Sequence, residues 1–360
     1  MASMASVDLV AVQVEVPLNT PYRIWQHDEG IPIYRGSYIE DLYHLPLGLW
    51  PRAGQSAAFI NLAGQEEDDA YVLEIVPGGH TEPLHHLFEE TIFILNGRGA
   101  TTFWSAADSE RKQTVEWQRG SLYSPPINCY YQHFNLDGEE PLRLFAITNA
   151  PMLMNIFRSP EFIFGDSFPF LDRYDGAEDF FRDRGHFSRR NMWKTNFVPD
   201  LRHFELEEDG NRVPGDMSMM FHLANNQMRC HVSEFDIGLY KRAHRHGAGA
   251  HLIVLDGTGY SLLWVEGEQP RKVEWRDGSV ISPAGGEYHQ HFNTGPTPAR
   301  YLALRPGELD YRRRQGLDYD ASEIDGIRYE DEDPAIYDLY VAECAKHGAK
   351  VELPRPKYGS

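Results

Sequence analysis

Short apolar runs that end in turn signals recur along the chain and predict an antiparallel β protein. Residues 91–95 read TIFIL and are followed by Asn-Gly, while residues 252–255 read LIVL and are followed by Asp-Gly. An apolar run that ends in Asn-Gly or Asp-Gly is the strongest short signal of a β-hairpin. Helical periodicity is almost absent between such runs. Evenly spaced strands of this kind are typical of two packed sheets in a sandwich or barrel, so we expect an all-β fold.

The chain contains an internal repeat. The sequence GRGATTFW at 97–104 recurs as GTGYSLLW at 257–264, and QHFN at 132–135 recurs at 290–293, about 160 residues later in each case. One unit of about 80 residues has therefore been duplicated. We predict two similar β-barrels in tandem, each with a lumen wide enough for one small ligand.

The repeat divides the chain into five segments. The segment between the two copies is too rich in aromatic residues to be a flexible linker, so we expect it to pack against the barrels. The predicted segments are an N-terminal arm at 1–65, a first barrel at 66–150, an inter-domain cover at 151–225, a second barrel at 226–306 and an acidic C-terminal region at 307–360. In the last segment, Asp333 and Pro334 have the residue types of an N-cap and a first helical turn, which predicts a short helix followed by an extended strap.

Charge and cysteine content restrict the partners. Fifty-four acidic and 34 basic residues give a formal net charge of −20 at pH 7, which repels nucleic-acid phosphates and anionic membranes. The chain shows neither the pattern of a secretion signal nor an apolar stretch long enough to span a membrane. Its three cysteines are widely separated, which suits a reducing compartment. We expect a cytoplasmic protein that contacts small molecules rather than nucleic acid or membrane, and that could form a homo-oligomer through edge strands.

Three histidines of the second copy have the spacing of metal ligands. His244 and His246 lie two residues apart, so their rings point to one face of a strand, and an adjacent strand could bring His289 to them. Neutral imidazole binds divalent iron, zinc, copper and nickel. A trio on one face also leaves coordination positions open for a substrate and dioxygen. The sequence predicts one divalent cation at this trio, with Fe(II) preferred and Mn, Zn, Ni or Cu as alternatives.

Two further histidines lie close to this trio. His291 shares the face of His289, which would make it either an alternative ligand or a nearby acid or base, and we assign it the catalytic proton transfer. His251 is ambiguous. Counting forward from His246 makes it a fourth or alternative ligand, whereas counting back from Gly257 turns it away from the metal.

Four other residues of the second copy could contact a substrate. Arg300 and Arg305, on or after the last strand, could bind a carboxylate through two parallel hydrogen bonds. Trp264 and Tyr288 could line a pocket for a planar ligand, although aromatic residues in small barrels more often belong to the core.

The first copy has lost most of the histidine arrangement. Leu84 stands where the second copy has His244, and Tyr131 stands where it has His289. The remnant of the site consists of His86, Glu90 and His133. We therefore expect a structural barrel, and a site rebuilt with the nearby His80, His85, Glu89 and His133 is the alternative.

The spacing of the second copy resembles the two sequence motifs of the cupin superfamily. Gly238, His244 and His246 match the first motif, Gly-x5-His-x-His, and His289 and Asn293 match the second, His-x3-Asn. The resemblance covers both copies of the repeat. It implies a bicupin, that is, two tandem cupin barrels of the double-stranded β-helix or jelly-roll type with a short C-terminal helix.

The missing glutamate narrows the resemblance. The repeat alignment puts Ala250 where cupins often have a glutamate ligand, which leaves histidines alone. The His289-Gln290-His291 stretch is similar to the His-x-His pair of gentisate-type dioxygenases, although the main site of that group lies in the first barrel. This resemblance implies a mononuclear Fe(II) dioxygenase that uses dioxygen to cleave a C–C bond of a hydroxylated aromatic or enolisable small molecule. The alternatives are a non-redox metal-dependent lyase, isomerase or decarboxylase, and a non-catalytic ligand-binding bicupin.

Overall fold

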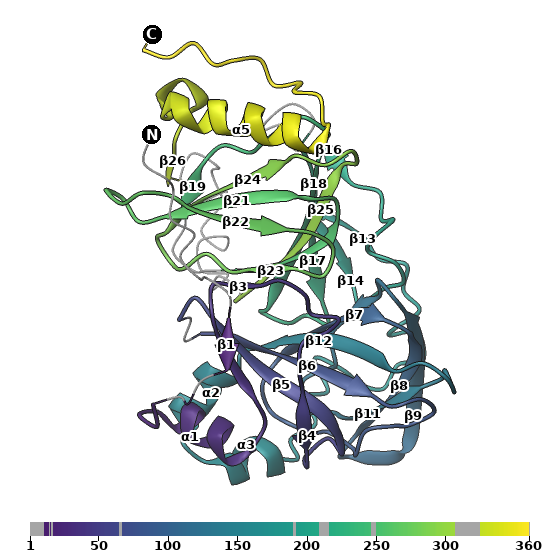
Figure 1. Ribbon diagram of the computed structural model, residues 1–360. Helices are drawn as coiled ribbons and strands as arrows, with labels where there is room; N and C mark the ends of the chain where they lie inside the picture. The colour runs from purple at the N-terminus through teal and green to yellow at the C-terminus, as the bar shows by residue number, and fades with distance from the viewer. Residues whose placement is uncertain are drawn as a thin grey trace.

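Two β-barrels follow one another along the chain, and a helix lies at the C-terminal end of the second (Figure 1). A computed structural model describes residues 11–13, 15, 17–64, 67–189, 192–208, 216–245, 250–306 and 325–359. The predicted all-β fold with two tandem barrels is confirmed.

Each barrel combines a large sheet with a smaller one. In the first barrel the large sheet runs in the order β1 (Val12–Gln13), β2 (Ile33–Gly36), β5 (Gln55–Leu62), β6 (Asp69–Ile75), β12 (Leu142–Thr148), β7 (Glu90–Asn96), β10 (Leu122–Tyr123) and β15 (Phe197–Val198), with β4 (Gly48–Trp50) on β5. The small sheet is formed by β11 (Tyr130–Asn135), β8 (Arg98–Ser105) and β9 (Asp108–Gln118).

The second barrel repeats this plan. Its large sheet runs in the order β13 (His186–Arg189), β14 (Met192–Thr195), β17 (Asp216–Leu223), β18 (Arg229–Phe235), β25 (Ala299–Arg305), β20 (His251–Asp256), β23 (Val280–Ile281) and β3 (Tyr38–Ile39), with β16 (Glu207–Glu208) on β17. The small sheet is formed by β22 (Arg271–Trp275), β21 (Gly259–Trp264), β24 (Tyr288–Asn293), β19 (His244–Arg245) and β26 (Asp325–Gly326). In each barrel one pair of strands near the edge is parallel, β2 with β5 and β14 with β17.

Each barrel also takes one short strand from the other half of the chain. β3 pairs with β23 of the second barrel, and β15 pairs with β10 of the first. Both short strands continue into segments that are held in the same way. The Leu42 N–H donates to the carbonyl of Gly278 at 2.9 Å, and the Leu201 N–H donates to the carbonyl of Gly120 at 2.8 Å. The duplication therefore includes the strands that cross between the barrels.

This exchange corrects the predicted segment boundaries. The supposed arm at 1–65 supplies β2, β4 and β5 to the first barrel, and the supposed cover at 151–225 supplies β17 to the second. These strands close the large sheets and are integral to the barrels. The sequence likeness upstream of residue 66 is too weak to reveal them.

The large sheets of the two barrels face each other across a shared apolar core. Ile60, Phe93 and Phe145 enter it from the first barrel, and Ile253 and Leu302 from the second. Because successive side chains of a strand point to opposite faces, the alternate positions of these strands face the barrel lumens.

The C-terminal helix covers the outer face of the small sheet in the second barrel (Figure 1). Helix α5 (Pro334–His347) follows the short 3-10 helix η2 (Tyr329–Asp331) and packs Tyr340 against Tyr260 and Phe292 of the sheet. The Asp333 carboxylate accepts from the backbone N–H two residues later at 2.9 Å, and Gly348 ends the helix with a φ of 75°. Both are the end signals that such a helix requires, and the predicted helix is confirmed.

Three short helices lie beside the first barrel. They are α1 (Pro21–Asp28), α2 (Ala150–Phe157) and α3 (Pro160–Gly165). Trp25 of α1 and Ile163 of α3 pack into the same core cluster as the inner face of the barrel. Across the described part of the chain, every helix is too short or too polar to cross a membrane.

Candidate functional site

The second barrel brings two of the three predicted ligands together. β19 pairs antiparallel with β24, and His244 lies directly opposite His289. Their ring centroids are 4.2 Å apart with an interplanar angle of 59°. His289 is buried and His244 is half-buried, so the pair extends from the barrel interior to its rim.

The hydrogen bonds of this pair determine which ring nitrogen could bind a cation. His244 Nδ1 lies 3.2 Å from the carbonyl oxygen of Arg242, and His289 Nδ1 lies 3.2 Å from that of Glu287. A carbonyl oxygen only accepts, so both Nδ1 atoms carry the proton and donate. In a neutral ring the lone pair is then on Nε2, the arrangement that metal-binding histidines commonly have. Both side chains therefore fit a divalent cation.

The third predicted ligand, His246, lies outside the described residues. Within the described ranges, no group of three His, Cys, Asp or Glu side chains is arranged to hold a metal ion. Ala250 occupies the position where cupins often have a glutamate ligand. It is buried among the apolar side chains inside this barrel. A complete site on His244 and His289 would therefore need His246.

His291 bonds a hydroxyl rather than a carbonyl. Its Nδ1 lies 2.7 Å from Ser261 Oγ, which also lies 3.0 Å from Trp275 Nε1. The indole N–H can only donate, so Ser261 accepts from Trp275, and its own proton is available for His291 Nδ1. In the tautomer to which Ser261 donates, the proton of the neutral imidazole is on Nε2. That tautomer suits the predicted role of His291 in proton transfer.

Further polar residues reach the same lumen, and sequence reasoning missed them. Lys241 is buried, contacts Ser233 Oγ through Nζ and lies 5.0 Å from the ring centroid of Tyr301. The rings of His231 and His291 lie 6.3 and 5.4 Å from the same tyrosine. The alternation of side chains along β18 was the sequence signal that could have revealed His231 and Ser233, because it places them on one face with Phe235. A void of about 10 Å³ beside His291 can hold one water molecule at most.

His251 is not a fourth ligand. It begins β20, in which Leu252 and Val254 face the lumen while Ile253 belongs to the core between the barrels. His251 lies on the face of Ile253, 6.4 Å from the ring of Phe145 in the first barrel. Burial lowers the pKa of His251 to about 4, so the ring is neutral. The orientation obtained by counting back from Gly257, which turns His251 away from the metal, agrees with this position because the count runs along β20.

Arg300 does not reach a substrate either. Its Nε donates to Glu234 at 2.7 Å, and its Nη1 donates to the carbonyl oxygens of Leu201, Arg202 and Phe204 at 3.1, 2.6 and 3.1 Å. Arg143 of the first barrel binds Glu74 and two carbonyls of the opposite crossing segment in the same way. Arg300 therefore clamps the chain between the barrels.

The predicted aromatic contacts also have a structural role. Trp264 stacks on Tyr288 with ring centroids 5.4 Å apart, and both lie in the cluster beneath the C-terminal helix rather than in the lumen. The guanidinium of Arg245 lies 4.4 Å from the ring centroid of Tyr288. Arg305 ends β25 opposite Arg229, and its contact with a substrate stays a prediction.

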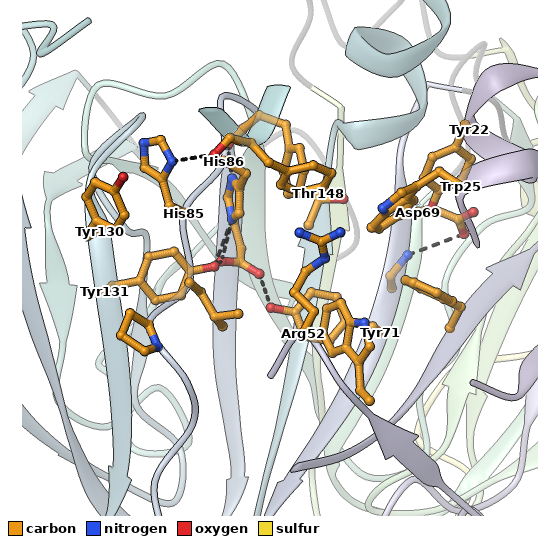
Figure 2. A pocket seen from close by; sticks show the side chains of 18 residues that line it. Tyr22, Trp25, Arg52, Asp69, Tyr71, His85, His86, Tyr130, Tyr131 and Thr148 are labelled. Atoms are coloured by element: carbon orange, nitrogen blue, oxygen red, sulfur yellow. Dashed lines mark hydrogen bonds and ion pairs between the residues drawn. The ribbon is translucent and has the colours of Figure 1, made fainter. Parts of the chain in front are cut away.

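The first barrel contains a different polar cluster, built on the remnant pair (Figure 2). Tyr131 Oη donates to Glu90 Oε2 at 2.6 Å and lies 2.8 Å from His86 Nε2. Tyr71 Oη donates to the other oxygen of Glu90. His86 Nδ1 donates to the carbonyl of Phe88 at 2.9 Å. His86 and Glu90 therefore meet around the hydroxyl of Tyr131.

The Tyr131 hydroxyl lies between His86 and Glu90, two side chains of types that bind metal ions. His86 Nε2 and Glu90 Oε2 are 3.5 Å apart, and the Tyr131 oxygen lies within hydrogen-bond distance of both. Burial raises the pKa of Glu90, but the hydrogen bonds of His86, Tyr131 and Tyr71 outweigh burial and lower that pKa overall. The Tyr131 hydroxyl thus lies between the two groups that a metal ion would otherwise bridge.

His133, the third member of the remnant, does not join this cluster. Its Nδ1 lies 2.8 Å from Thr101 Oγ1, which accepts from Trp117 Nε1 at 2.8 Å. Burial lowers the pKa of His133 to about 4. His133 is therefore the counterpart of His291 and keeps the same support, but it does not line the cavity described next.

A cavity of about 210 Å³ opens beside the cluster (Figure 2). Its polar lining includes His85, His86, Glu90 and Arg52. Its aromatic walls include Tyr22, Trp25, Trp50, Phe59, Phe88 and Phe164. Sequence reasoning missed this cavity because five of these six aromatic residues come from helices and strands outside the predicted barrel at 66–150.

Comparison with known proteins supports the fold assignment. No family model matches the chain. The structure is similar to an oxalate decarboxylase from Lactobacillus farciminis in a formate complex, with 10% identity and a TM-score of 0.52 over 85% of this chain and 94% of that one. It is also similar to the oxalate decarboxylase of Bacillus subtilis with its Mn(II) centres, with 13% identity and a TM-score of 0.50 over 80% and 85%. A vicilin from hazelnut, Corylus avellana, gives 11% identity and a TM-score of 0.49 over 85% and 94%.

At these identities the similarity to the decarboxylases shows the fold alone. That fold is the predicted pair of tandem cupin barrels. None of these proteins is a gentisate dioxygenase, so the finer resemblance to that group stays a prediction.

Proposed function

We propose that the second barrel binds one divalent cation and catalyses a non-redox reaction of the lyase, isomerase or decarboxylase type on a small organic acid. The observation that carries this proposal is the facing pair of His244 and His289, each with its Nδ1 proton donated to a main-chain carbonyl. His246 would be the third ligand. A cation held there would act as a Lewis acid toward a carboxylate or carbonyl oxygen.

The chain itself would position the substrate and move the proton. His291 lies next to His289, with ring centroids 5.6 Å apart, and with its proton on Nε2 it would deliver that proton to the atom that gains electron density. The buried ammonium of Lys241 adds positive charge to the lumen, which favours an anionic substrate. The void of about 10 Å³ beside His291 leaves little room for a substrate there, so we place the reaction at the rim where His244 lies.

Manganese is the ion that the comparisons favour. The B. subtilis oxalate decarboxylase of the same fold has Mn(II) centres. Fe(II) is second, on the resemblance to three-histidine dioxygenases. Imidazole ligands would also accept Zn(II), Ni(II) or Cu(II) in the order of their intrinsic affinities.

Metal content tests the site directly. Protein stripped with a chelator and reloaded with Mn(II) should retain one equivalent per chain in elemental analysis, and His244→Ala and His246→Ala should each lose most of it. His27→Ala is the matched control, because His27 is an exposed histidine of α1 whose Nδ1 lies 3.2 Å from Asp28. Equal metal retention in His244→Ala and His27→Ala would refute the site.

Dioxygen dependence tests the reaction class. A dioxygenase is the second candidate, because the position of Ala250 in the lumen offers no carboxylate ligand and leaves an all-histidine set. We expect carbon dioxide or formate release from small dicarboxylates at the same rate in an anaerobic chamber as in air. Turnover of catechols, hydroxybenzoates or diketones that stops without dioxygen would favour the dioxygenase instead.

A further inference from the structure

The first barrel contains a cavity that the proposed metal chemistry does not use. Its volume of about 210 Å³ suits a single ring with a short substituent, since a cavity of about 150 Å³ already binds benzene. Nine of the 18 residues around it are Phe, Tyr or Trp, so half of the residues in its wall are aromatic. Such walls favour an apolar or cationic body and give little support to an anion.

The polar groups at the end of this cavity accept hydrogen bonds. Tyr71 and Tyr131 both donate their hydroxyl protons to Glu90. His85 Nδ1 donates to the carbonyl of Phe164 at 2.9 Å, which leaves the lone pair of a neutral ring on Nε2. That Nε2 is buried and has no partner within the described residues. Because the protons of this cluster are committed, a ligand that binds here must supply donors of its own.

The remaining charges of the cavity are already paired. Arg52 donates from Nε to Glu29 at 3.0 Å, and its guanidinium lies 3.9 Å from the ring centroid of Phe164. Asp69 pairs with Arg23 at 3.3 Å. Neither the arginine nor the aspartate therefore offers an unpaired charge, and the cavity has no free cation for a ligand carboxylate.

We propose that the first barrel is a metal-free binding site for a small protonated amine carried on a single aromatic or apolar ring. The ammonium group would donate to Glu90 and His85 while its charge lies against aromatic faces, and the ring would fill the rest of the cavity. The indole N–H of Trp25 has no partner within the described residues, and a neutral acceptor on the ligand would satisfy it. This site is independent of the function proposed for the second barrel.

Three probes of equal size test the chemistry on the unaltered protein. Benzylammonium, benzyl alcohol and benzoate share one ring and differ in charge and donors. By isothermal titration calorimetry we expect benzylammonium to bind at least about tenfold more tightly than benzyl alcohol, with benzoate weakest. Benzoate binding as tightly as benzylammonium, or no benzylammonium binding up to about 10 mM, would overturn the proposal.

Substitutions then identify the group that recognises the amine. Glu90→Gln keeps the shape of the side chain and removes its charge, so it should weaken benzylammonium by at least about tenfold and benzyl alcohol by less than about threefold. Leu84→Phe fills the cavity and should abolish binding of both probes. Tyr123→Phe is the control, because Tyr123 is a buried tyrosine that bonds Thr101 and does not line the cavity.

The two variants keep the test informative even if one of them fails to fold. If Glu90→Gln is unstable, Leu84→Phe still decides whether the probe enters this cavity. Unchanged benzylammonium affinity in Leu84→Phe would remove the site from the first barrel, and unchanged affinity in a folded Glu90→Gln would contradict recognition of the ammonium by Glu90.

The metal site provides the last control. His244→Ala and chelator-stripped protein should bind benzylammonium as the native protein does, whether or not the metal proposal holds. Loss of amine binding on metal removal would place the amine in the second barrel and contradict this inference.

Discussion

The two barrels share the hydrogen bonds that hold one buried histidine, and they differ in the residues that lie next to it. In the first barrel, Trp117 donates to Thr101, which bonds His133; in the second, Trp275 donates to Ser261, which bonds His291. In both barrels the hydroxyl bonds Nδ1 of the imidazole and can donate its proton there. The two copies of the repeat therefore kept a histidine held by the same hydrogen bonds, while the neighbouring residues differ.

The changed positions are the reason for proposing a metal site in one barrel and a metal-free ligand site in the other. His244 and His289 of the second barrel correspond to Leu84 and Tyr131 of the first. In the first barrel the hydroxyl of Tyr131 joins His86 to Glu90 through hydrogen bonds. The loss of two ligands thus left a satisfied polar cluster beside a cavity instead of an unpaired buried carboxylate, which would be costly.

The largest expected effect comes from breaking the metal pair. His289→Ala should remove the bound cation and lower turnover by more than about 100-fold, because even the loss of an outer hydrogen-bond partner of a ligand costs 10–100-fold. Tyr131→Phe, at the equivalent position of the first barrel, should leave metal content and turnover unchanged. Elemental analysis and initial rates check both. A similar loss in the two variants would mean that the barrels share one function.

The converse change should create a metal site. Leu84→His with Tyr131→His restores the two missing imidazoles next to His86 and Glu90, and removes the hydroxyl that joins them. We expect a second equivalent of Mn(II) per chain and loss of benzylammonium binding. Elemental analysis and calorimetry measure the two outcomes. A double variant that folds, shows no added metal and still binds the amine would show that ligand positions alone do not decide between the barrels.

The sequence predicted the fold and the facing histidines because both depend on local patterns. The repeated GRGATTFW and QHFN stretches located two copies of one barrel, and the strand period placed His289 and His291 on one face. The crossing strands at 38–39 and 197–198 were missed because two residues carry no readable periodicity. His251 was ambiguous because the count back from Gly257 runs along β20, whereas the count from His246 starts at a residue outside the described ones.

The roles of Arg300 and the first-barrel cavity could not be read from the sequence. Arg300 has the residue type and position of a carboxylate clamp, but the crossing segment provides carbonyls that occupy it. The cavity depends on Trp25, Trp50 and Phe164, which come together only after the helices and edge strands pack on the barrel. Contacts between distant segments, rather than spacing, decide both cases.

Acid should weaken the contact between the barrels. The folded pKa of His251 is lowered by burial from 6.5 to about 4. Between these values the unfolded chain takes up a proton that the folded chain does not, so stability is fully present above pH 6.5 and falls as the pH drops toward 4. The expected loss is about 3 kcal/mol in the free energy of unfolding.

Urea unfolding at several pH values measures this loss. His251→Leu should flatten part of the pH dependence and leave the share of His133, whose pKa is also lowered to about 4. His27→Leu, at an exposed site, should change nothing. An unchanged pH profile in His251→Leu would show that the buried ring does not titrate with folding.

The smallest expected effect concerns the hydroxyl that orients His291. Ser261→Ala removes the donor to His291 Nδ1, so the ring can exchange tautomers and lose the Nε2 proton that the reaction requires. Turnover should fall by about tenfold with little change in KM or bound metal, because a positioning partner affects orientation more than binding. Ser261→Thr introduces the hydroxyl that the first barrel uses at Thr101, and it should restore the rate. Thr101→Val is the matched change in the first barrel and should leave turnover as it is, since His133 there is remote from the metal. If Ser261→Ala is folded but Ser261→Thr does not recover activity, the loss of rate is not caused by the missing hydroxyl. His291 would then not depend on the hydrogen bond that both barrels contain.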